Sequence, residues 1–259
     1  MELDFLSVTE LAGDEVTQEQ VDRLCHRYYW AGTYCEGKDV LEAACGTGQG
    51  LGYLAKRAKS LSAGDYTADI LKIAREHYGD RIELKQFDAQ EIPYADNSMD
   101  VIILFEAIYY VPSAEKFVSE CRRVLRKGGK VLIATANKDL YDFNPSPYSH
   151  KYYGVVELNE LFSKQGFSVE CFGNTPVTEV SLRQKILRPV KKFAVEFGLV
   201  PKSMGGKKLL KKLVFGGLLK MPAEIGEGMV PYVEPTQLPL SEPDKKHKVI
   251  YCAATLQQK

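Results

Sequence analysis

The chain has 259 residues, of which 45% are hydrophobic and 26% are charged. These proportions are ordinary for a globular protein and exclude a collagen-like or mostly disordered chain. No stretch approaches about 18 apolar residues, so no membrane-spanning helix is expected, and the acidic start argues against a secretory signal. The six cysteines are at least ten residues apart. This spacing leaves no CxxC pair for a zinc site, so we expect no metal centre and reduced thiols in the cytoplasm.

The first 35 residues favour a helix, because a stripe of side chains repeats every four positions from Val16 to Tyr28. Short apolar runs then alternate with helical patterns. This alternation predicts an α/β architecture, in which helices cover both faces of a parallel sheet. Ligands of such sheets bind beyond the carboxyl ends of the strands.

The continuous apolar run at 101–105 is typical of a central parallel strand that is buried on both faces. The helix at 114–125 is expected to stop at Gly128 and Gly129. Strands are predicted at 40–41, 60–65, 82–87, 101–105, 131–134, 167–172 and 249–255, and helices at 50–58, 69–78, 114–125 and 156–164.

The net charge of zero conceals a strongly basic stretch. Residues 181–221 hold eleven Lys or Arg and one acid, Glu196. The region 176–246 also departs from the alternation of strands and helices. Two cationic helical patterns, at 182–197 and 207–220, precede a proline-bearing tail in which regular helix is not expected.

A glycine-rich turn follows the first predicted strand. The P-loop pattern GxxxxGK[ST] is absent. The dinucleotide pattern GxGxxG does not match either, because Leu51 occupies the position of its third glycine. The spacing is instead Gly46-x-Gly48-x-Gly50, with Glu42 four residues before the first glycine.

This arrangement resembles the class I S-adenosylmethionine (SAM) dependent methyltransferases, whose first motif is an acid followed by a GxGxG turn. The resemblance covers roughly residues 38–172. It implies a Rossmann-like, seven-stranded, mostly parallel sheet. The family usually joins its last two strands by a short hairpin, so the basic region of this chain is predicted to be a helical insertion before the last strand. The resemblance also implies SAM as cofactor and S-adenosylhomocysteine (SAH) as product. The further matches, in order, are Asp65 at the end of the second strand, the segments 87–100 and 105–112, and the approach to the fifth strand at 124–133.

The resemblance also implies the roles of individual residues. Asp65 would accept hydrogen bonds from both ribose hydroxyls, and Glu42 would accept one from the cofactor's ammonium, directly or through water. Asp88 would contact the adenine amino group. For a single acid at a strand end, solvation or helix capping is the alternative explanation. The implied cofactor-binding residues are Glu42, Ala43, Cys45, Gly46 and Gly48 at the turn, Asp65 and Tyr66, Asp88 and Ala89, and Phe105 and Glu106.

A sulfonium cofactor carries an activated methyl group, so the protein mainly aligns the reactants, and a general base is needed only for an acceptor such as a hydroxyl. His150 lies in the loop after the fifth strand and is the candidate base, with a structural hydrogen bond as the alternative role. Tyr110 stands where many members of the family have a histidine. It is a candidate substrate contact, or else a packed aromatic residue. His77 and His247 are expected at the surface.

The sequence therefore predicts a helical segment at 1–37, a SAM-binding core at 38–175 and 247–259, and a basic cap at 176–246. The expected reaction is in-line methyl transfer to a small-molecule, sugar or lipid-linked acceptor, at oxygen. The stretch 181–221 fits a solvated cap or a contact with an anionic membrane surface; its aliphatic character disfavours nucleic acid. The expected location is the cytoplasm or the membrane periphery. A non-catalytic SAM- or partner-binding protein and an NAD(P)-dependent oxidoreductase are the alternatives.

Overall fold

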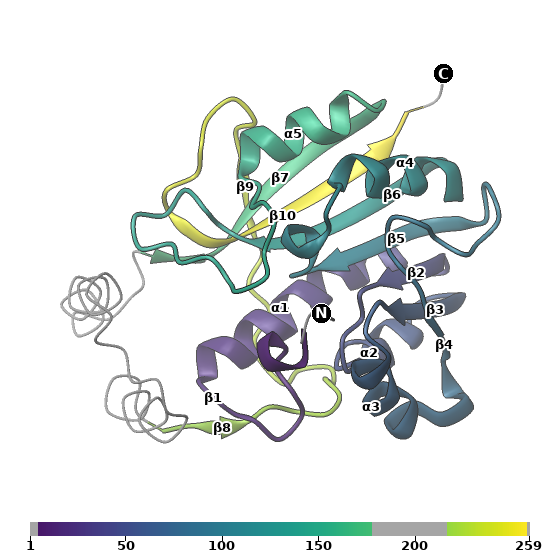
Figure 1. Ribbon diagram of the computed structural model, residues 1–259. Coiled ribbons are helices and arrows are strands. Elements are labelled where there is room, and N and C mark those ends of the chain that lie inside the picture. Colours follow the sequence, from purple (N-terminus) through teal and green to yellow (C-terminus); the bar gives the residue numbers. More distant parts are fainter. Residues whose placement is uncertain (1–4, 178–216, 258–259) are drawn as a thin grey trace.

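A mixed sheet of eight strands runs through the part of the chain that the structure, a computed structural model, describes: residues 5–177 and 217–257 (Figure 1). The strand order is β4-β3-β2-β5-β6-β10-β7-β9. The predicted count of seven is therefore one short, because the three-residue edge strand β9 was not foreseen. The strands are β2 (Asp39–Ala43), β3 (Ser60–Asp65), β4 (Glu83–Gln86), β5 (Met99–Phe105), β6 (Leu125–Ala136), β7 (Phe167–Pro176), β9 (Thr236–Leu238) and β10 (His247–Leu256).

The parallel half of the sheet creates the edge at which a ligand can bind. Strands β4, β3, β2, β5 and β6 are parallel to one another, so their carboxyl ends meet on one side. Strand β10 enters between β6 and β7 and is antiparallel to both. Such a sheet is buried on both faces, which explains the continuous apolar run in β5.

Helices cover both faces, as the alternation predicts (Figure 1). On one face, Phe117 and Phe162 are fully buried against the sheet. On the other, Trp30 stacks on Tyr251 of β10, with ring centroids 4.8 Å apart. Each large apolar side chain buried in this way contributes about 2 kcal/mol. The helices are α1 (Gln18–Cys35), α2 (Leu51–Ala55), α3 (Ala68–Tyr78), α4 (Ala114–Val124) and α5 (Val155–Ser163), with 3₁₀ turns η1 (Phe5–Val8), η2 (Gly79–Arg81) and η3 (Ile108–Tyr110).

Two local predictions are wrong. The helix expected at 50–58 ends at Ala55. The pair Gly128–Gly129 does not stop α4 but lies inside β6. Helix α4 ends at Val124 because Leu125 has extended backbone and pairs with Met99 of β5.

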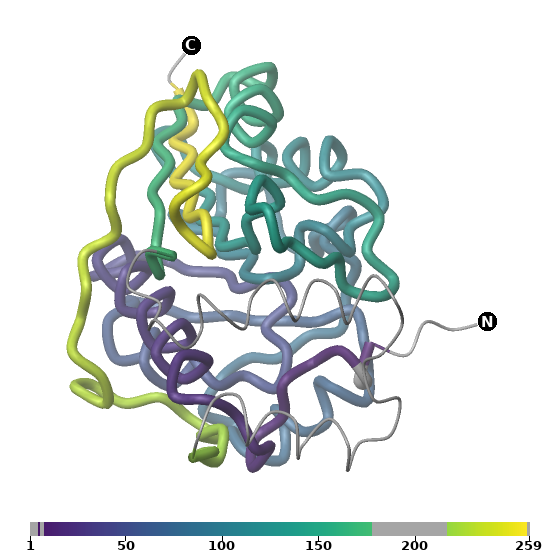
Figure 2. Tube along the Cα trace, turned by 90° about the vertical axis from the view of Figure 1, so that its left-hand side faces the viewer, coloured from purple at the N-terminus to yellow at the C-terminus, as the bar shows by residue number. Residues whose placement is uncertain are grey.

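The described end of the basic stretch, at residues 217–221, lies beside the segment that precedes α1. Residues 178–216 lie outside the described part, and with them the cationic pattern at 182–197 and most of that at 207–220. At its described end the latter is extended rather than helical. There, β8 (Leu219–Lys220) pairs with β1 (Glu15–Val16). Figure 2 shows the chain from β8 to β10 running along the outside of α1. Among the described residues, we find no helix both long and apolar enough to cross a membrane.

The prediction of a surface position for His247 is wrong. Its side chain is buried, and its Nδ1 lies 3.1 Å from Oδ1 of Asp244, which is also buried. Asp244 Oδ2 accepts hydrogen bonds from His247 N at 2.9 Å and Asn137 Nδ2 at 3.0 Å. The flanking lysines indicated an exposed segment. However, β10 begins at His247, and this first residue of the strand is buried.

We expect Asp244→Ala to destabilise the protein by about 2 kcal/mol, because it leaves buried donors without their acceptors. Urea unfolding followed by circular dichroism measures the change. The exposed neighbour Glu242 supplies the control variant Glu242→Ala, which we expect to leave the midpoint almost unchanged. Equal midpoints for the two variants would contradict a structural role for the Asp244 network.

Candidate functional site

A cavity of about 450 Å³ opens at the carboxyl ends of the parallel strands. Its walls come from the ends of β2, β3 and β5, from one face of α1, from η1 and from the loop around residue 150. Of the residues predicted from the sequence, Glu42, Ala43 and Gly48 flank the cavity without lining it. The predicted residues that line it are Cys45, Gly46, Asp65, Tyr66, Asp88, Ala89, Phe105, Glu106, Tyr110 and His150.

Two non-glycine residues at strand ends have left-handed backbone and line this cavity. Ala44 after β2 has φ +67°, and Glu106 after β5 has φ +51°. Such conformations are uncommon and concentrate at functional sites, where the surrounding structure holds them in place. The backbone thus turns sharply at both strand ends, which brings the cavity wall close to any ligand.

Asp65 ties the end of β3 to the glycine turn. Its Oδ2 accepts a hydrogen bond from Gly46 N at 3.0 Å, and its Oδ1 accepts one from Thr67 N at 2.9 Å. The side chain is nearly buried, and this burial raises the pKa of the carboxyl group against the opposing effect of the backbone donors. Each oxygen retains accepting capacity for a hydroxyl donor in the cavity.

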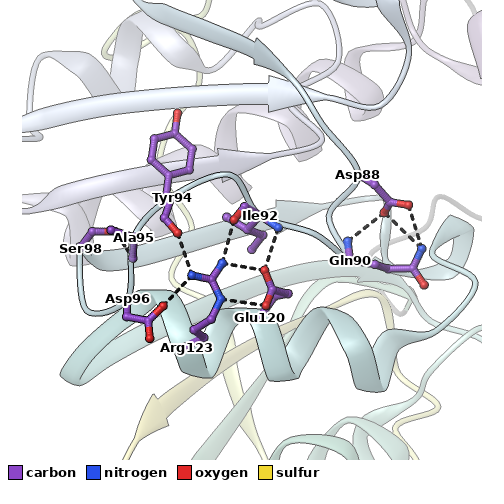
Figure 3. Close-up of polar contacts among 9 residues, drawn as sticks. All are labelled: Asp88, Gln90, Ile92, Tyr94, Ala95, Asp96, Ser98, Glu120 and Arg123. Carbon is purple, nitrogen blue, oxygen red and sulfur yellow. Dashed lines mark hydrogen bonds and ion pairs between the residues drawn. The ribbon is translucent and has the colours of Figure 1, made fainter.

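Asp88 follows β4 and is held by the next turn (Figure 3). Its Oδ1 accepts a hydrogen bond from Gln90 N at 2.8 Å, and the Gln90 amide contacts both carboxylate oxygens. Beyond this turn, the Arg123 guanidinium donates to Ile92 O and Tyr94 O, both at 2.8 Å. The loop that presents Asp88 is therefore braced from α4.

Glu42 is a buried acid at the end of β2. Its Oε1 accepts a hydrogen bond from the Tyr28 hydroxyl at 2.6 Å, while its Oε2 has no hydrogen-bond partner among the described residues. Burial raises the pKa of Glu42 to about 8, although the Tyr28 hydroxyl opposes that rise. A cationic ligand group next to this carboxylate would relieve its isolation.

Arg27 is a site residue that the sequence analysis missed. It lines the cavity, and its NH1 lies 3.8 Å from Oε1 of Glu106, whose other oxygen accepts a hydrogen bond from the Tyr109 hydroxyl at 3.2 Å. Arg27 Nε is buried and has no partner in the described ranges. The sequence did hold one indication: Arg27 comes four residues after Arg23, so both lie on one face of α1, and both line the cavity.

The far side of the cavity is aromatic. The Tyr110 hydroxyl lies 2.5 Å from Ser146 Oγ, and the backbone N of His150 donates to Tyr109 O at 2.7 Å. The loop that carries His150 is thus fastened to η3, while the His150 side chain is exposed. Phe5 of η1 packs edge-on against Tyr110, with ring centroids 5.4 Å apart. This N-terminal cover was not foreseen from the sequence.

Comparison with known proteins identifies the class. The fold is shared by the solved phosphoethanolamine N-methyltransferase 2 of Haemonchus contortus, a SAM complex; the TM-score is 0.54 at 18% identity, over 93% of this chain and 53% of that one. The family model described as "Methyltransferase domain" matches residues 41–133. These residues belong to the class I SAM-dependent methyltransferase family, and the oxidoreductase alternative is set aside.

Two relatives share only part of their length with this chain. A protein named "Probable S-adenosylmethionine-dependent methyltransferase" of Mycolicibacterium smegmatis is 36% identical over 152 residues, 57% of this chain and 56% of that protein. A fatty-acid O-methyltransferase of the same organism is 36% identical over 104 residues, 39% of this chain and 38% of that protein. The chain thus spans about half the length of the first relative and less of the second.

Proposed function

We propose that the protein transfers a methyl group from SAM to an oxygen of a small-molecule, sugar or lipid-linked acceptor. The observation that carries the proposal is the convergence of three acids on one cavity. Asp65 is the last residue of β3, and Asp88 and Glu106 come just after β4 and β5; all three acids line the cavity. Carboxylates in such positions suit a cofactor that bears ribose hydroxyls and amino groups.

The described residues fit SAM. Asp65 has free accepting capacity for the ribose hydroxyls, and Glu42 has an unpartnered buried oxygen for the ammonium group. Arg27, with its unpartnered Nε, supplies a cation for the carboxylate of the methionine part. The remaining proposed contacts are Tyr66, Asp88 and Ala89 with the adenine, Ala43, Cys45, Gly46 and Gly48 as the turn, and Phe105 and Glu106 with the methionine part.

When bound, SAM supplies an activated methyl group, so the protein's task is to orient the acceptor and exclude water. The aromatic wall with Phe5 and Tyr110 suits both tasks. If the acceptor is a hydroxyl, it must lose a proton, and His150 is the cavity residue that we assign to accept it.

We expect His150→Gln to slow methyl transfer about tenfold, less than for a buried base, because water reaches the exposed ring and replaces part of its function. Single-turnover transfer from SAM measures the change. An unchanged rate would remove His150 from the mechanism.

The nature of the acceptor is the finer part of the proposal. The name of one relative, a fatty-acid O-methyltransferase, supports an oxygen acceptor and a lipid. The basic stretch 181–221 supports contact with an anionic membrane surface, since each basic residue near such a surface contributes about 1 kcal/mol. We infer a core at 38–175 and 247–259 and an inserted cap at 176–246, acting in the cytoplasm or at the membrane periphery.

Two measurements test the function. Isothermal titration with SAH asks whether the cavity binds the cofactor product. Radiolabelled methyl transfer from SAM into a cell extract, separated into lipid, glycan, small-molecule, protein and RNA fractions, then identifies the acceptor class. Label in the lipid, glycan or small-molecule fraction supports the proposal, and label in the protein or RNA fraction alone contradicts the proposed acceptor class. SAH binding without label in any fraction would favour the non-catalytic alternative, and absence of SAH binding would overturn both.

A further inference from the structure

Tyr78, the last residue of α3, reaches the glycine turn from behind. Its hydroxyl group donates a hydrogen bond to Gly48 O at 2.6 Å and accepts one from Gly52 N at 3.1 Å. Only 2% of the residue is exposed. Gly52 N lies in the first turn of α2, where backbone N–H groups have no partner within the helix. One hydroxyl group therefore joins the turn to the start of the helix that follows it.

The Tyr78 ring occupies the space that a side chain at residue 48 would need. A Cβ atom at Gly48 would lie 2.8 Å from the Tyr78 ring, and Gly48 has φ +84°, a conformation that favours glycine. The Arg81 guanidinium lies over the face of the ring, 4.8 Å from its centroid. The ring thus contacts both the turn and Arg81, and it packs among buried apolar residues that include Leu51 and Leu71.

Hydrogen bonds also hold the turn at Gly46, on the side of the proposed cofactor site. Gly46 N donates to Asp65, and Gly48 N donates to Cys45 O at 3.0 Å. Cys45 and Gly46 line the cavity, whereas Tyr78 does not. Asp65 and Tyr78 therefore hold the turn from two sides, one beside the cavity and one behind it.

We propose that Tyr78 is a positioning residue for the cofactor: its hydroxyl group holds the turn from Cys45 to Gly48, before the cofactor arrives, in the shape that binds it. This inference rests on the proposed function, because SAM or SAH is the ligand that would benefit from a preformed turn. Without the hydroxyl group, Gly52 N loses its acceptor in a buried position, and the turn gains freedom that binding must then remove.

The chain supplies a matched control. The Tyr29 hydroxyl also bridges two backbone groups, donating to Gly226 O at 2.6 Å and accepting from Met229 N at 3.0 Å, but it does so in the segment outside α1. The experiment measures SAH affinity by titration calorimetry and thermal stability for the wild type, Tyr78→Phe and Tyr29→Phe. Both variants lose one hydroxyl group and two backbone contacts.

We expect both variants to lose similar stability, and only Tyr78→Phe to bind SAH about tenfold more weakly. Equal SAH affinity for Tyr78→Phe and the wild type overturns the inference and leaves the proposed function intact. Equal weakening in both variants also overturns it, because a general loss of stability then explains the effect. A wild type that does not bind SAH refutes the proposed function itself and the inference with it.

The wild type alone provides a second test if Tyr78→Phe does not fold. Amide hydrogen exchange at Gly52 is compared with and without SAH. A turn held by Tyr78 has a protected Gly52 amide before SAH is added, which supports the inference. An amide that becomes protected only with SAH overturns it, because the ligand and not Tyr78 would then form the turn.

Discussion

Asp65→Ala is expected to weaken SAH binding by about a hundredfold or more. The change removes the proposed acceptor for two ribose hydroxyls, and charge-assisted hydrogen bonds of this kind contribute about 1.5 to 3 kcal/mol each. It also frees Gly46 N and Thr67 N, which the carboxylate holds at 3.0 and 2.9 Å. Titration calorimetry with SAH provides the measurement.

The control for this variant is Asp69→Ala on α3, since Asp69 is exposed and does not line the cavity. We expect its SAH affinity to equal that of the wild type. Undiminished binding by Asp65→Ala would show that the cofactor site lies elsewhere. Equal losses in both variants would point to damage in the β3–α3 connection rather than to a lost contact.

The strand-end residues were predictable because parallel strands place their carboxyl ends at one edge. The order of strands and helices, together with the spacing of Asp65 and Asp88, is sufficient to place both acids on the cavity. At Gly48 the structure shows a packing role that the sequence did not indicate: the missing side chain makes room for Tyr78. The assignment of this glycine to the cofactor-binding turn stays a prediction.

Residues that reach the site from outside this alternation were not predictable. Arg27 belongs to an amphipathic helix on which several charged residues have similar spacing, and only the packing of α1 shows that Arg27 lines the cavity. Phe5 comes from a short 3₁₀ turn with no periodic signal. Outside the site, the burial of His247 was missed for a similar reason. Two lysines precede this residue and indicate a solvated segment, whereas β10 begins at His247 and buries it. The positions of all three residues depend on long-range packing, which the local sequence pattern does not encode.

The second large effect concerns stability at alkaline pH. Burial raises the pKa of Glu42 from 4.5 to about 8, so the folded protein binds a proton more tightly than the unfolded chain does. This stabilising contribution is complete below about pH 4.5, declines as the pH rises, and is lost above about pH 8. The total loss is on the order of a few kcal/mol.

Glu42→Gln should remove this loss, because the amide does not ionise and its oxygen still accepts from the Tyr28 hydroxyl. At about pH 9 we expect the variant to melt roughly 5 to 10 °C above the wild type, and at about pH 5 we expect little difference. Differential scanning calorimetry across this range measures the effect. Glu36→Gln at an exposed position is the control, with no pH-dependent gain.

Greater stability should accompany weaker cofactor binding in Glu42→Gln, because the unpartnered Glu42 oxygen is the proposed partner of the cofactor's ammonium group. We expect wild-type SAM affinity to rise as the pH increases from about 6 to about 8, and the variant to bind about tenfold more weakly at the upper end. A stable variant with undiminished SAM affinity would separate Glu42 from the cofactor. If Glu42→Gln melted below the wild type at alkaline pH, the result would instead show that the fold stabilises the ionised Glu42 carboxylate. The expected combination would identify Glu42 as an acid kept for binding at the expense of stability.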